Sequence, residues 1–232
     1  DNLSVQVHPD DEYARIHEND SGKTESWYVL HAESGAKLIY GHNAKSKEEL
    51  EDWIKNGKWS KLLRYVPVKE GDFLYVPSGT VHALTKGIMV IETQQSSDVT
   101  YRLYDWDRVD KKTGKKRELH IKQSLDTIQV PHKDPKLKIT SETVGDVKII
   151  TLAQPPMSPH FYLWQIDVGD FAWSLNDHPY LLVSVIKGSG KFIADGKEYD
   201  IKLGSNFIIP NEMKNFSFSG NLRLVISAPG KE

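Results

Sequence analysis

Two histidines, one glutamate and one glutamine are the side chains of this sequence with the clearest capacity for chemistry. Gln6 and His8 alternate in Ser-Val-Gln-Val-His-Pro, Glu25 ends Gly-Lys-Thr-Glu, and His82 ends Pro-Ser-Gly-Thr-Val-His. One carboxylate, two imidazoles and a carboxamide form a sulfur-free donor set that suits zinc and leaves a position open for a substrate oxygen. Because these motifs are far apart in the sequence, only a tertiary fold can bring them together.

Each of these residues also has a simpler interpretation. Residues 3–7 have the pattern of a strand, so Gln6 and His8 project from the same face. A strand histidine is nevertheless often only hydrogen-bonded, and the Pro-Asp-Asp at 9–11 that follows is expected to form a turn. Glu25 alone fits an edge carboxylate in water, and His82 alone fits a buried histidine with its hydrogen bonds satisfied.

Three further polar residues accompany the four candidate ligands. Lys23, two residues before Glu25, can steady a phosphate or a developing oxyanion, or it can be a solvated lysine. Arg102 can offer its planar fork to a phosphate or sugar oxygen. Its alternative is a structural ion pair with Asp98 or Asp105. Glu92 can act as a general base if its surroundings raise its pKa, or it can be a half-buried structural acid.

Other candidate motifs give no site. The Lys-Gly-Ser-Gly-Lys at 187–191 lacks the spacing of a phosphate-binding loop and is expected to be a strand turn. The remaining histidines show no pairing with other chemistry-bearing residues. They are His17, His31, His42, His120, His132, His160 and His178.

The elements that must position these residues are mostly short strands punctuated by Gly, Pro, Asn and Asp. The expected strands are 27–30, 36–40, 73–76, 180–186, 191–194, 206–209 and 222–226, and Asp195-Gly196 fits a two-residue hairpin turn. A capping box at Ser46–Glu49 predicts a helix that ends near Asn56-Gly57. A second helix is expected over 122–127, and residues 107–117 read as an exposed loop.

A diverged internal repeat organises the chain. Gly-Asp-Phe-Leu-Tyr-Val-Pro at 71–77 resembles Gly-Ser-Asn-Phe-Ile-Ile-Pro at 204–210, and residues 29–35 resemble residues 184–190. The capped helix accounts for the extra length of the first copy. His82 then corresponds to Asn215 and Glu25 to Tyr180, so the second copy lacks the ligands and is expected to be structural.

Composition limits the classes of protein. The chain has 232 residues, of which 38% are hydrophobic and 27% charged, with a formal charge of −2. These values describe an ordinary globular protein and give no reason to expect a nucleic acid or a membrane as partner. The absence of cysteine excludes disulfides and thiolate metal sites and fits a cytoplasmic location.

The candidate ligands follow one another in the sequence as a closely spaced pair, then an acid, then a distant histidine. This order is typical of metal-binding cupin barrels. The motifs that contain them resemble those of the type I mannose-6-phosphate isomerases in their short bacterial form. The stretch Gln-Ser-Ser-Asp-Val-Thr-Tyr-Arg at 95–102 adds to the match. The resemblance implies a mainly β fold of two cupin (jelly-roll) units with a small helical insert and a linker helix. The metal-binding cupin would span 1–105, the linker 106–154 and the metal-free cupin 155–232.

The same resemblance implies reversible interconversion of mannose 6-phosphate and fructose 6-phosphate through an enediol(ate), with one Zn²⁺ per chain. The implied ligands are Gln6, His8, Glu25 and His82. Lys23 and Arg102 would handle substrate oxygens or phosphate, Ser4 would contact phosphate, and Glu92 would be a proton-transfer group. The family's stretch before the Gln-x-His strand is expected to be missing from this chain.

Two other functions remain open at this point. The first is an Fe(II) cupin dioxygenase, which usually holds iron with two or three histidines and a carboxylate, so Gln6 argues against it. The second is a non-catalytic cupin that binds sugar or metal. The sequence predicts a small sugar phosphate as partner and makes no prediction of oligomeric state.

Overall fold

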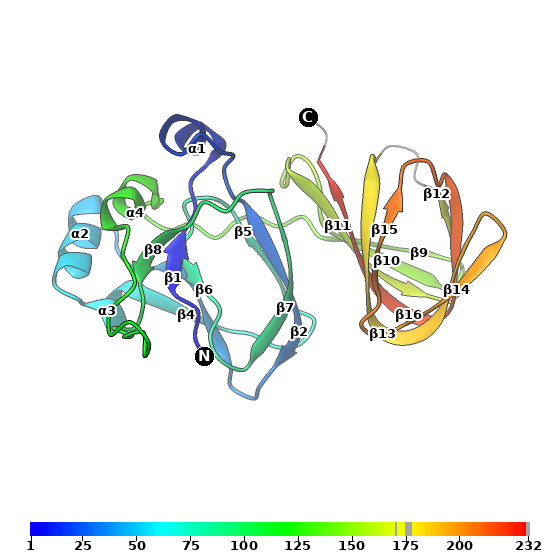
Figure 1. Ribbon diagram of the computed structural model, residues 1–232, viewed down its shortest axis with the longest axis horizontal. Helices are drawn as coiled ribbons and strands as arrows, with labels where there is room; N and C mark the ends of the chain where they lie inside the picture. The colour runs from blue at the N-terminus through cyan, green and yellow to red at the C-terminus, as the bar shows by residue number, and fades with distance from the viewer. Residues whose placement is uncertain (170, 175–177, 231–232) are drawn as a thin grey trace. The chain divides into compact units, whose positions relative to one another are not determined.

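The computed structural model describes residues 1–169, 171–174 and 178–230, which fall into two compact units at 1–135 and 136–232 (Figure 1). The segment expected to be a linker, 106–154, is therefore shared between the units. None of the helices in the described part of the chain has the length and apolar character that crossing a membrane requires.

The first unit is a pair of antiparallel sheets with helices on one side. Its helices are α1 (Asp11–His17), α2 (Lys47–Lys55), α3 (Trp59–Leu62) and α4 (Ile121–Thr127). Its strands are β1 (Val5–Val7), β2 (Glu25–Ala32), β3 (Lys37–His42), β4 (Leu63–Pro67), β5 (Phe73–Val76), β6 (His82–Ala83), β7 (Ile88–Gln94) and β8 (Tyr101–Tyr104). One sheet has the order β4-β3-β6-β1-β8 and the other β5-β2-β7.

Helices α2, α3 and α4 cover the side of the five-stranded sheet that faces away from the three-stranded sheet (Figure 1). Ser46 and Glu49 begin α2 as expected, because Ser46 Oγ accepts from the Glu49 amide at 3.2 Å and Glu49 Oε2 accepts from the Lys45 amide at 2.7 Å. Leu50, Trp53 and Ile54 are the buried face of α2. The expected second helix is α4, one residue longer than predicted.

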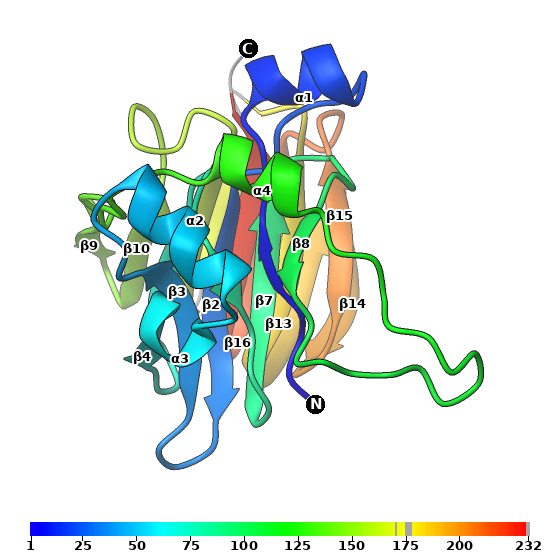
Figure 2. The ribbon, with the colours of Figure 1, turned by 90° about the vertical axis from the view of Figure 1, so that its left-hand side faces the viewer.

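The turn expected at 9–11 is wrong, because α1 starts there. Asp10 is its N-cap, and the Asp10 carboxylate accepts from the Tyr13 amide at 2.9 Å. The sequence signal was missed because α1 buries only Ala14 and has no apolar stripe. The loop expected at 107–117 lies between β8 and α4 and extends away from the sheets, as Figure 2 shows.

The second unit contains an eight-stranded antiparallel sheet. Its strands are β9 (Thr140–Val144), β10 (Val147–Ala153), β11 (Phe161–Val168), β12 (Phe171–Ser174), β13 (Tyr180–Ala194), β14 (Lys197–Lys202), β15 (Asn206–Pro210) and β16 (Asn215–Pro229). The order is β14-β13-β16-β11-β10-β9, with β12 on β16 and β15 on β13. The strands expected separately at 180–186 and 191–194 are one strand, β13, bent by a bulge between Val185 and Lys187.

The hairpin expected at Asp195-Gly196 joins β13 to β14. Both residues have positive φ, 50° and 72°, as a turn matching the twist of its strands requires. The pairings also agree with the repeat, since β2 pairs with β5 in the first unit and β13 pairs with β15 in the second, both antiparallel. The second unit has its own core, centred on Ile166, Leu181 and Leu224.

The cap of α2 can be tested by Ser46→Ala. The Glu49 amide loses its acceptor, so we expect the free energy of unfolding to fall by about 1 kcal/mol. Urea denaturation measures this loss. Ser34→Ala, in an exposed turn, is the control and is expected to leave the unfolding midpoint unchanged; an equal effect of both substitutions would contradict the cap.

Candidate metal centre

The two candidate imidazoles and the candidate carboxylate meet inside the first unit. His8 directly follows β1, His82 begins β6 and Glu25 begins β2. β1 and β6 are neighbours in the five-stranded sheet, whereas β2 is in the three-stranded sheet. The imidazoles therefore come from one sheet and the carboxylate from the other.

The ligand atoms of these three residues lie within 4.8 Å of one another. His8 Nε2 is 3.0 Å from Glu25 Oε1, and His82 Nε2 is 3.5 Å from Glu25 Oε2. All three side chains are 1% exposed. His8 Nε2 and Glu25 Oε2 are buried without a hydrogen-bond partner among the described residues. Buried polar atoms are rarely left in this state, so the site is arranged for an electrophile.

Backbone carbonyls orient both rings. The Nδ1 of His8 lies 2.8 Å from the Val99 carbonyl, and the Nδ1 of His82 lies 2.8 Å from the Thr80 carbonyl. A carbonyl oxygen only accepts, so each Nδ1 must carry the proton. The Nε2 atom of each ring faces the Glu25 carboxylate. This is the tautomer in which histidine binds a metal through Nε2.

The pKa values agree with this protonation state. Burial lowers the pKa of His82 to about 4, so its ring is neutral at physiological pH. Burial alone raises the pKa of Glu25, but its contact with His8 and the proximity of His82 and Lys23 outweigh burial and lower this pKa to about 2. The ionised carboxylate of Glu25 and the neutral ring of His82 are the forms that bind a divalent cation.

Gln6, the fourth candidate ligand, lies beside His82. It pairs directly with His82 across β1 and β6, and its Nε2 lies 3.3 Å from His82 Nε2. Amide oxygen and nitrogen exchange places when the group rotates by half a turn, which would present Oε1 to the same point. The residues present therefore fit a zinc site with oxygen and nitrogen donors.

Lys23 and Glu92 lie beside these ligands. Lys23 Nζ is 3.3 Å from Glu25 Oε1, with 12% of its side chain exposed, so it is not a solvated surface lysine. Glu92 is opposite Trp27 in the β2–β7 pair, and the Trp27 indole donates to its Oε2 at 2.9 Å. Partial burial of the carboxyl group raises the pKa of Glu92, and the charge of Glu25 adds to the rise.

Arg102 and Ser4 lie on the strands next to the ligands. Arg102 is opposite Gln6 in the β1–β8 pair, and its guanidinium donates to the Glu118 carbonyl at 2.9 Å. The alternative ion pair of Arg102 with Asp105 is not formed, because that carboxylate accepts from Arg108 and Arg117. Arg102 Nε is buried without a hydrogen-bond partner in the described chain. Ser4 is buried immediately before β1.

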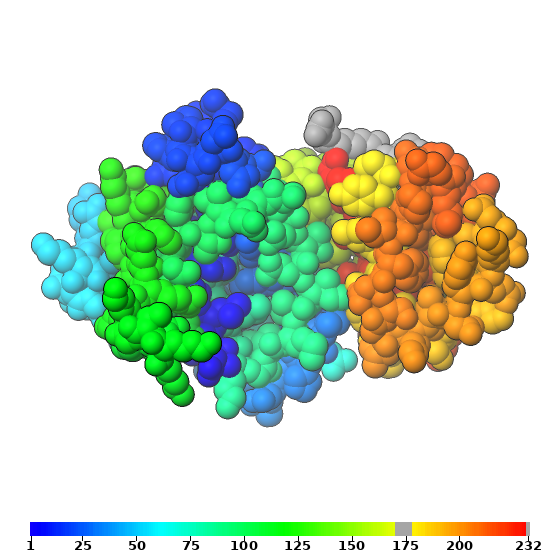
Figure 3. All heavy atoms as spheres, viewed as in Figure 1, coloured from blue at the N-terminus to red at the C-terminus, as the bar shows by residue number. Residues whose placement is uncertain are grey.

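Part of the N-terminal segment is visible in the space-filling picture. Figure 3 shows the dark-blue N-terminal residues at the floor of a furrow, between the green segment that follows β8 and the teal strands of the three-stranded sheet.

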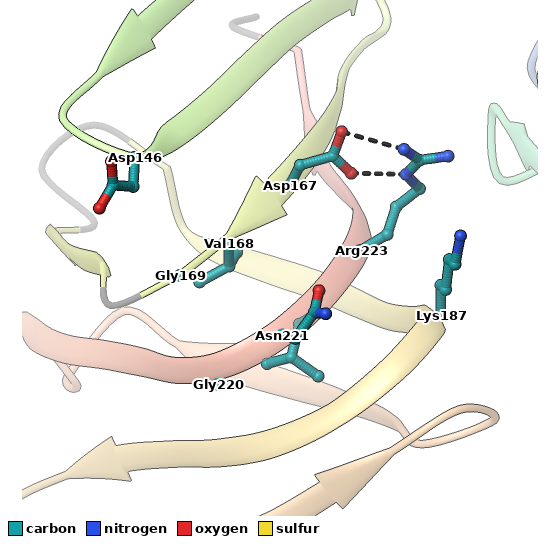
Figure 4. Close-up of a pocket in the computed structure, with 9 residues that line it drawn as sticks. Asp146, Asp167, Val168, Gly169, Lys187, Gly220, Asn221 and Arg223 are labelled. Atoms are coloured by element: carbon teal, nitrogen blue, oxygen red, sulfur yellow. Dashed lines mark hydrogen bonds and ion pairs between the residues drawn. The ribbon is translucent and has the colours of Figure 1, made fainter.

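A larger hollow, of about 610 Å³, lies in the second unit and contains none of the candidate ligands. Its charged lining includes Asp167 and Arg223, which form a two-pronged ion pair with each other (Figure 4). In the described residues, the metal-type cluster is that of the first unit. The cluster of possible metal ligands therefore makes the first unit, and not this hollow, the candidate functional site.

Comparison with known proteins decides the family. A family model described as "Mannose-6-phosphate isomerase, cupin domain" matches residues 157–229. The chain is 46% identical over 227 residues to mannose-6-phosphate isomerase of Streptococcus mutans serotype c, covering 97% of this chain and 70% of that protein. This chain belongs to the mannose-6-phosphate isomerase family. The resemblance predicted from the motifs is confirmed, as is a mainly β fold with a cupin domain.

Further relatives and solved structures support the same family assignment. Mannose-6-phosphate isomerase ManA of Bacillus subtilis is 46% identical over 226 residues, covering 97% of this chain and 70% of that protein. A crystal structure of the mannose 6-phosphate isomerase from Bacillus subtilis superposes with a TM-score of 0.90 at 42% identity, covering 97% of this chain and 71% of that one. A putative mannosephosphate isomerase from Archaeoglobus fulgidus shares the fold at a TM-score of 0.70 and 17% identity, covering 99% of this chain and 69% of that one.

The Asp105 cluster gives a pH-dependent prediction. Hydrogen bonds from Arg117 and Arg108 lower the pKa of Asp105 to about 2. A lowered pKa in the folded state adds stability above the unfolded value of about 3.9, and this is lost as pH falls toward 2. We therefore expect Asp105→Asn to unfold at lower urea concentration than the parent at pH 7, with the gap closing between about pH 4 and pH 2.

The control for this prediction is Asp98→Asn, which changes an exposed carboxylate in the adjoining loop and is expected to leave the urea midpoint at pH 7 close to that of the parent. A gap for Asp105→Asn that stays constant from pH 7 to pH 2 would contradict the charge-based account.

Proposed function

We propose that this chain interconverts mannose 6-phosphate and fructose 6-phosphate with one zinc ion held by Gln6, His8, Glu25 and His82. The observation that carries the proposal is the buried meeting of two Nε2 lone pairs with a carboxylate, in a chain of this family. Zinc is favoured because all the donors are nitrogen or oxygen and no thiolate is present. When bound, the ion supplies a Lewis acid that polarises a substrate oxygen.

Isomerisation requires a proton to move between C1 and C2 of the open-chain sugar through an enediol(ate). Glu92 is our candidate for this transfer, because its raised pKa brings it closer to neutrality and the Trp27 indole fixes one of its oxygens. The hydrogen bond orients the carboxylate and leaves its other oxygen available to the substrate.

Two cations suit the phosphate and the developing negative charge of the substrate. Lys23 is partly buried beside Glu25, and Arg102 extends from the strand next to Gln6. With a divalent cation bound and a single carboxylate among the ligands, the centre carries net positive charge, which attracts an anionic sugar. We propose that Lys23 and Arg102 hold substrate oxygens or phosphate and that Ser4 contributes a hydroxyl contact to the phosphate.

The metal dependence can be tested with a coupled assay that follows fructose 6-phosphate formed from mannose 6-phosphate. We expect activity to disappear on chelation and to return with added zinc. His82→Ala removes one imidazole and is expected to lower zinc affinity by at least 10-fold and to abolish turnover. Folded, zinc-loaded protein that does not turn over would contradict the isomerase proposal and favour a binding cupin.

The role of Glu92 can be tested by Glu92→Gln, which keeps the shape and removes the proton carrier. We expect kcat to fall by roughly 10²- to 10⁴-fold, with KM and zinc content little changed. Glu70→Gln, in an exposed turn, serves as the control. A kcat within about 3-fold of the parent would assign the proton transfer to another group.

A further inference from the structure

The turn that precedes β6 supports both candidate imidazoles. The Gly79 amide donates to the His8 carbonyl at 2.9 Å, and the Thr80 carbonyl accepts from the Nδ1 of His82 at 2.8 Å. The turn is closed by the Thr80 amide, which donates to the Pro77 carbonyl at 3.2 Å. A displacement of residues 77–80 would therefore shift the backbone of one ligand and the ring of the other.

The far side of this turn is held by the segment that follows α4. The Gln129 amide donates to the Gly79 carbonyl at 3.0 Å. Gly79 has φ of +80°, and a Cβ there would lie 3.1 Å from the Thr127 carbonyl and 3.4 Å from the Gln129 amide. Both the backbone angle and the closeness of the α4 segment therefore call for glycine. The turn lies directly against residues 127–129.

His42 holds that segment in turn. Its Nε2 lies 2.9 Å from the Gln129 carbonyl, which can only accept, so Nε2 carries the proton. Its Nδ1 is buried and has no hydrogen-bond partner among the described residues, and the residue is 4% exposed. His42 ends β3, whose Tyr40 is paired with His82 across β6. One donor from a buried ring thus fixes the Gln129 peptide.

The other end of the segment is anchored independently. Arg64 donates two hydrogen bonds to the Asp134 carboxylate, at 2.6 and 2.9 Å, and His132 Nε2 lies 3.1 Å from the same carboxylate. Removing the His42 donor would therefore loosen residues near Gln129 without detaching the whole segment.

We propose that His42 is a positioning residue for the candidate metal centre. It acts through the chain of hydrogen bonds His42 Nε2 to Gln129 carbonyl, Gln129 amide to Gly79 carbonyl, and Gly79 amide to His8 carbonyl. The proposal rests on the proposed zinc site, and it assigns a task to a histidine whose sequence context shows no partner. Outer hydrogen-bond partners of metal ligands change metal affinity by 10- to 100-fold in other proteins.

The test is the zinc dissociation constant, measured on the whole chain by competition with a chromophoric chelator. His42→Phe keeps a ring and removes the donor, and we expect its zinc affinity to be roughly 10-fold weaker than that of the parent. His42→Gln returns an Nε2 donor and is expected to restore affinity to within about 3-fold. The control is His31→Phe, at an exposed histidine of β2, which is expected to bind as the parent does.

A second variant tests the same chain of hydrogen bonds by removing a backbone donor. Gln129→Pro removes the amide that donates to Gly79 and leaves His42 and the Gln129 carbonyl in place. The preceding Ile128 already has extended backbone angles, φ −61° and ψ 127°, which a following proline accepts. We expect the same weakening of zinc binding, with faster exchange of the Gly79 amide hydrogen. This variant carries the test if His42→Phe does not fold.

Unchanged zinc affinity in folded His42→Phe or in Gln129→Pro would overturn the positioning role. Equal weakening in His42→Phe and His42→Gln would also overturn it, because the effect would then not depend on the donor. If the zinc site itself were absent, the result would differ. The parent would then bind no zinc, or it would bind zinc with an affinity that His82→Ala leaves unchanged.

Discussion

Glu25 carries a negative charge where almost no solvent reaches it, and much of the first unit compensates for that charge. A buried carboxylate is costly unless it is paired and hydrogen-bonded. The imidazoles of His8 and His82 and the ammonium group of Lys23 surround it, and their contacts keep its pKa at about 2 despite burial. The compensation is incomplete, because Oε2 and the facing His8 Nε2 lack hydrogen bonds among the described residues. A divalent cation would contact both atoms and offset the buried negative charge. The same ion would therefore serve the proposed reaction and the electrostatic balance of the site.

The geometry that makes this possible begins in backbone register. Gln6 lies opposite both His82 and Arg102, so β1 is the strand that brings the amide ligand, the late histidine and the arginine to one part of the sheet. A slip of one residue would turn Gln6 to the opposite face. Val5 and Val7, which alternate with Gln6, are completely buried and oppose that slip. Apolar packing on one face of β1 therefore holds the polar chemistry on the other.

The candidate ligands could be named from the sequence because each is a side chain in a compact motif, and the structure brings His8, Glu25 and His82 together. Strands and capped helices were also predictable where the signal is local, as at Ser46 and at Asp195-Gly196. The groups that hold the candidate ligands in position could not be predicted in the same way. Val99, Thr80 and Gln129 act through backbone groups, whose partners depend on tertiary structure and not on residue type. His42 has no local signal, and helix α1 was missed because it depends on an Asp10 cap without an apolar stripe. The alternative of an Arg102–Asp105 ion pair is not realised, because Asp105 engages two arginines supplied by the following loop.

The origin of the candidate ligands in two different sheets has a consequence for how the first unit holds together. β1 and β6 belong to one sheet and β2 to the other, so an ion bound by His8, His82 and Glu25 would be a covalent-like tie across the interior. An ion that binds only the folded unit adds its binding free energy to the stability of the fold, whereas a disulfide acts mainly by constraining the unfolded chain. The chain has no cysteine with which to form such a cross-link. The metal centre would then link the two sheets and stabilise the first unit, in addition to supplying its reactive group.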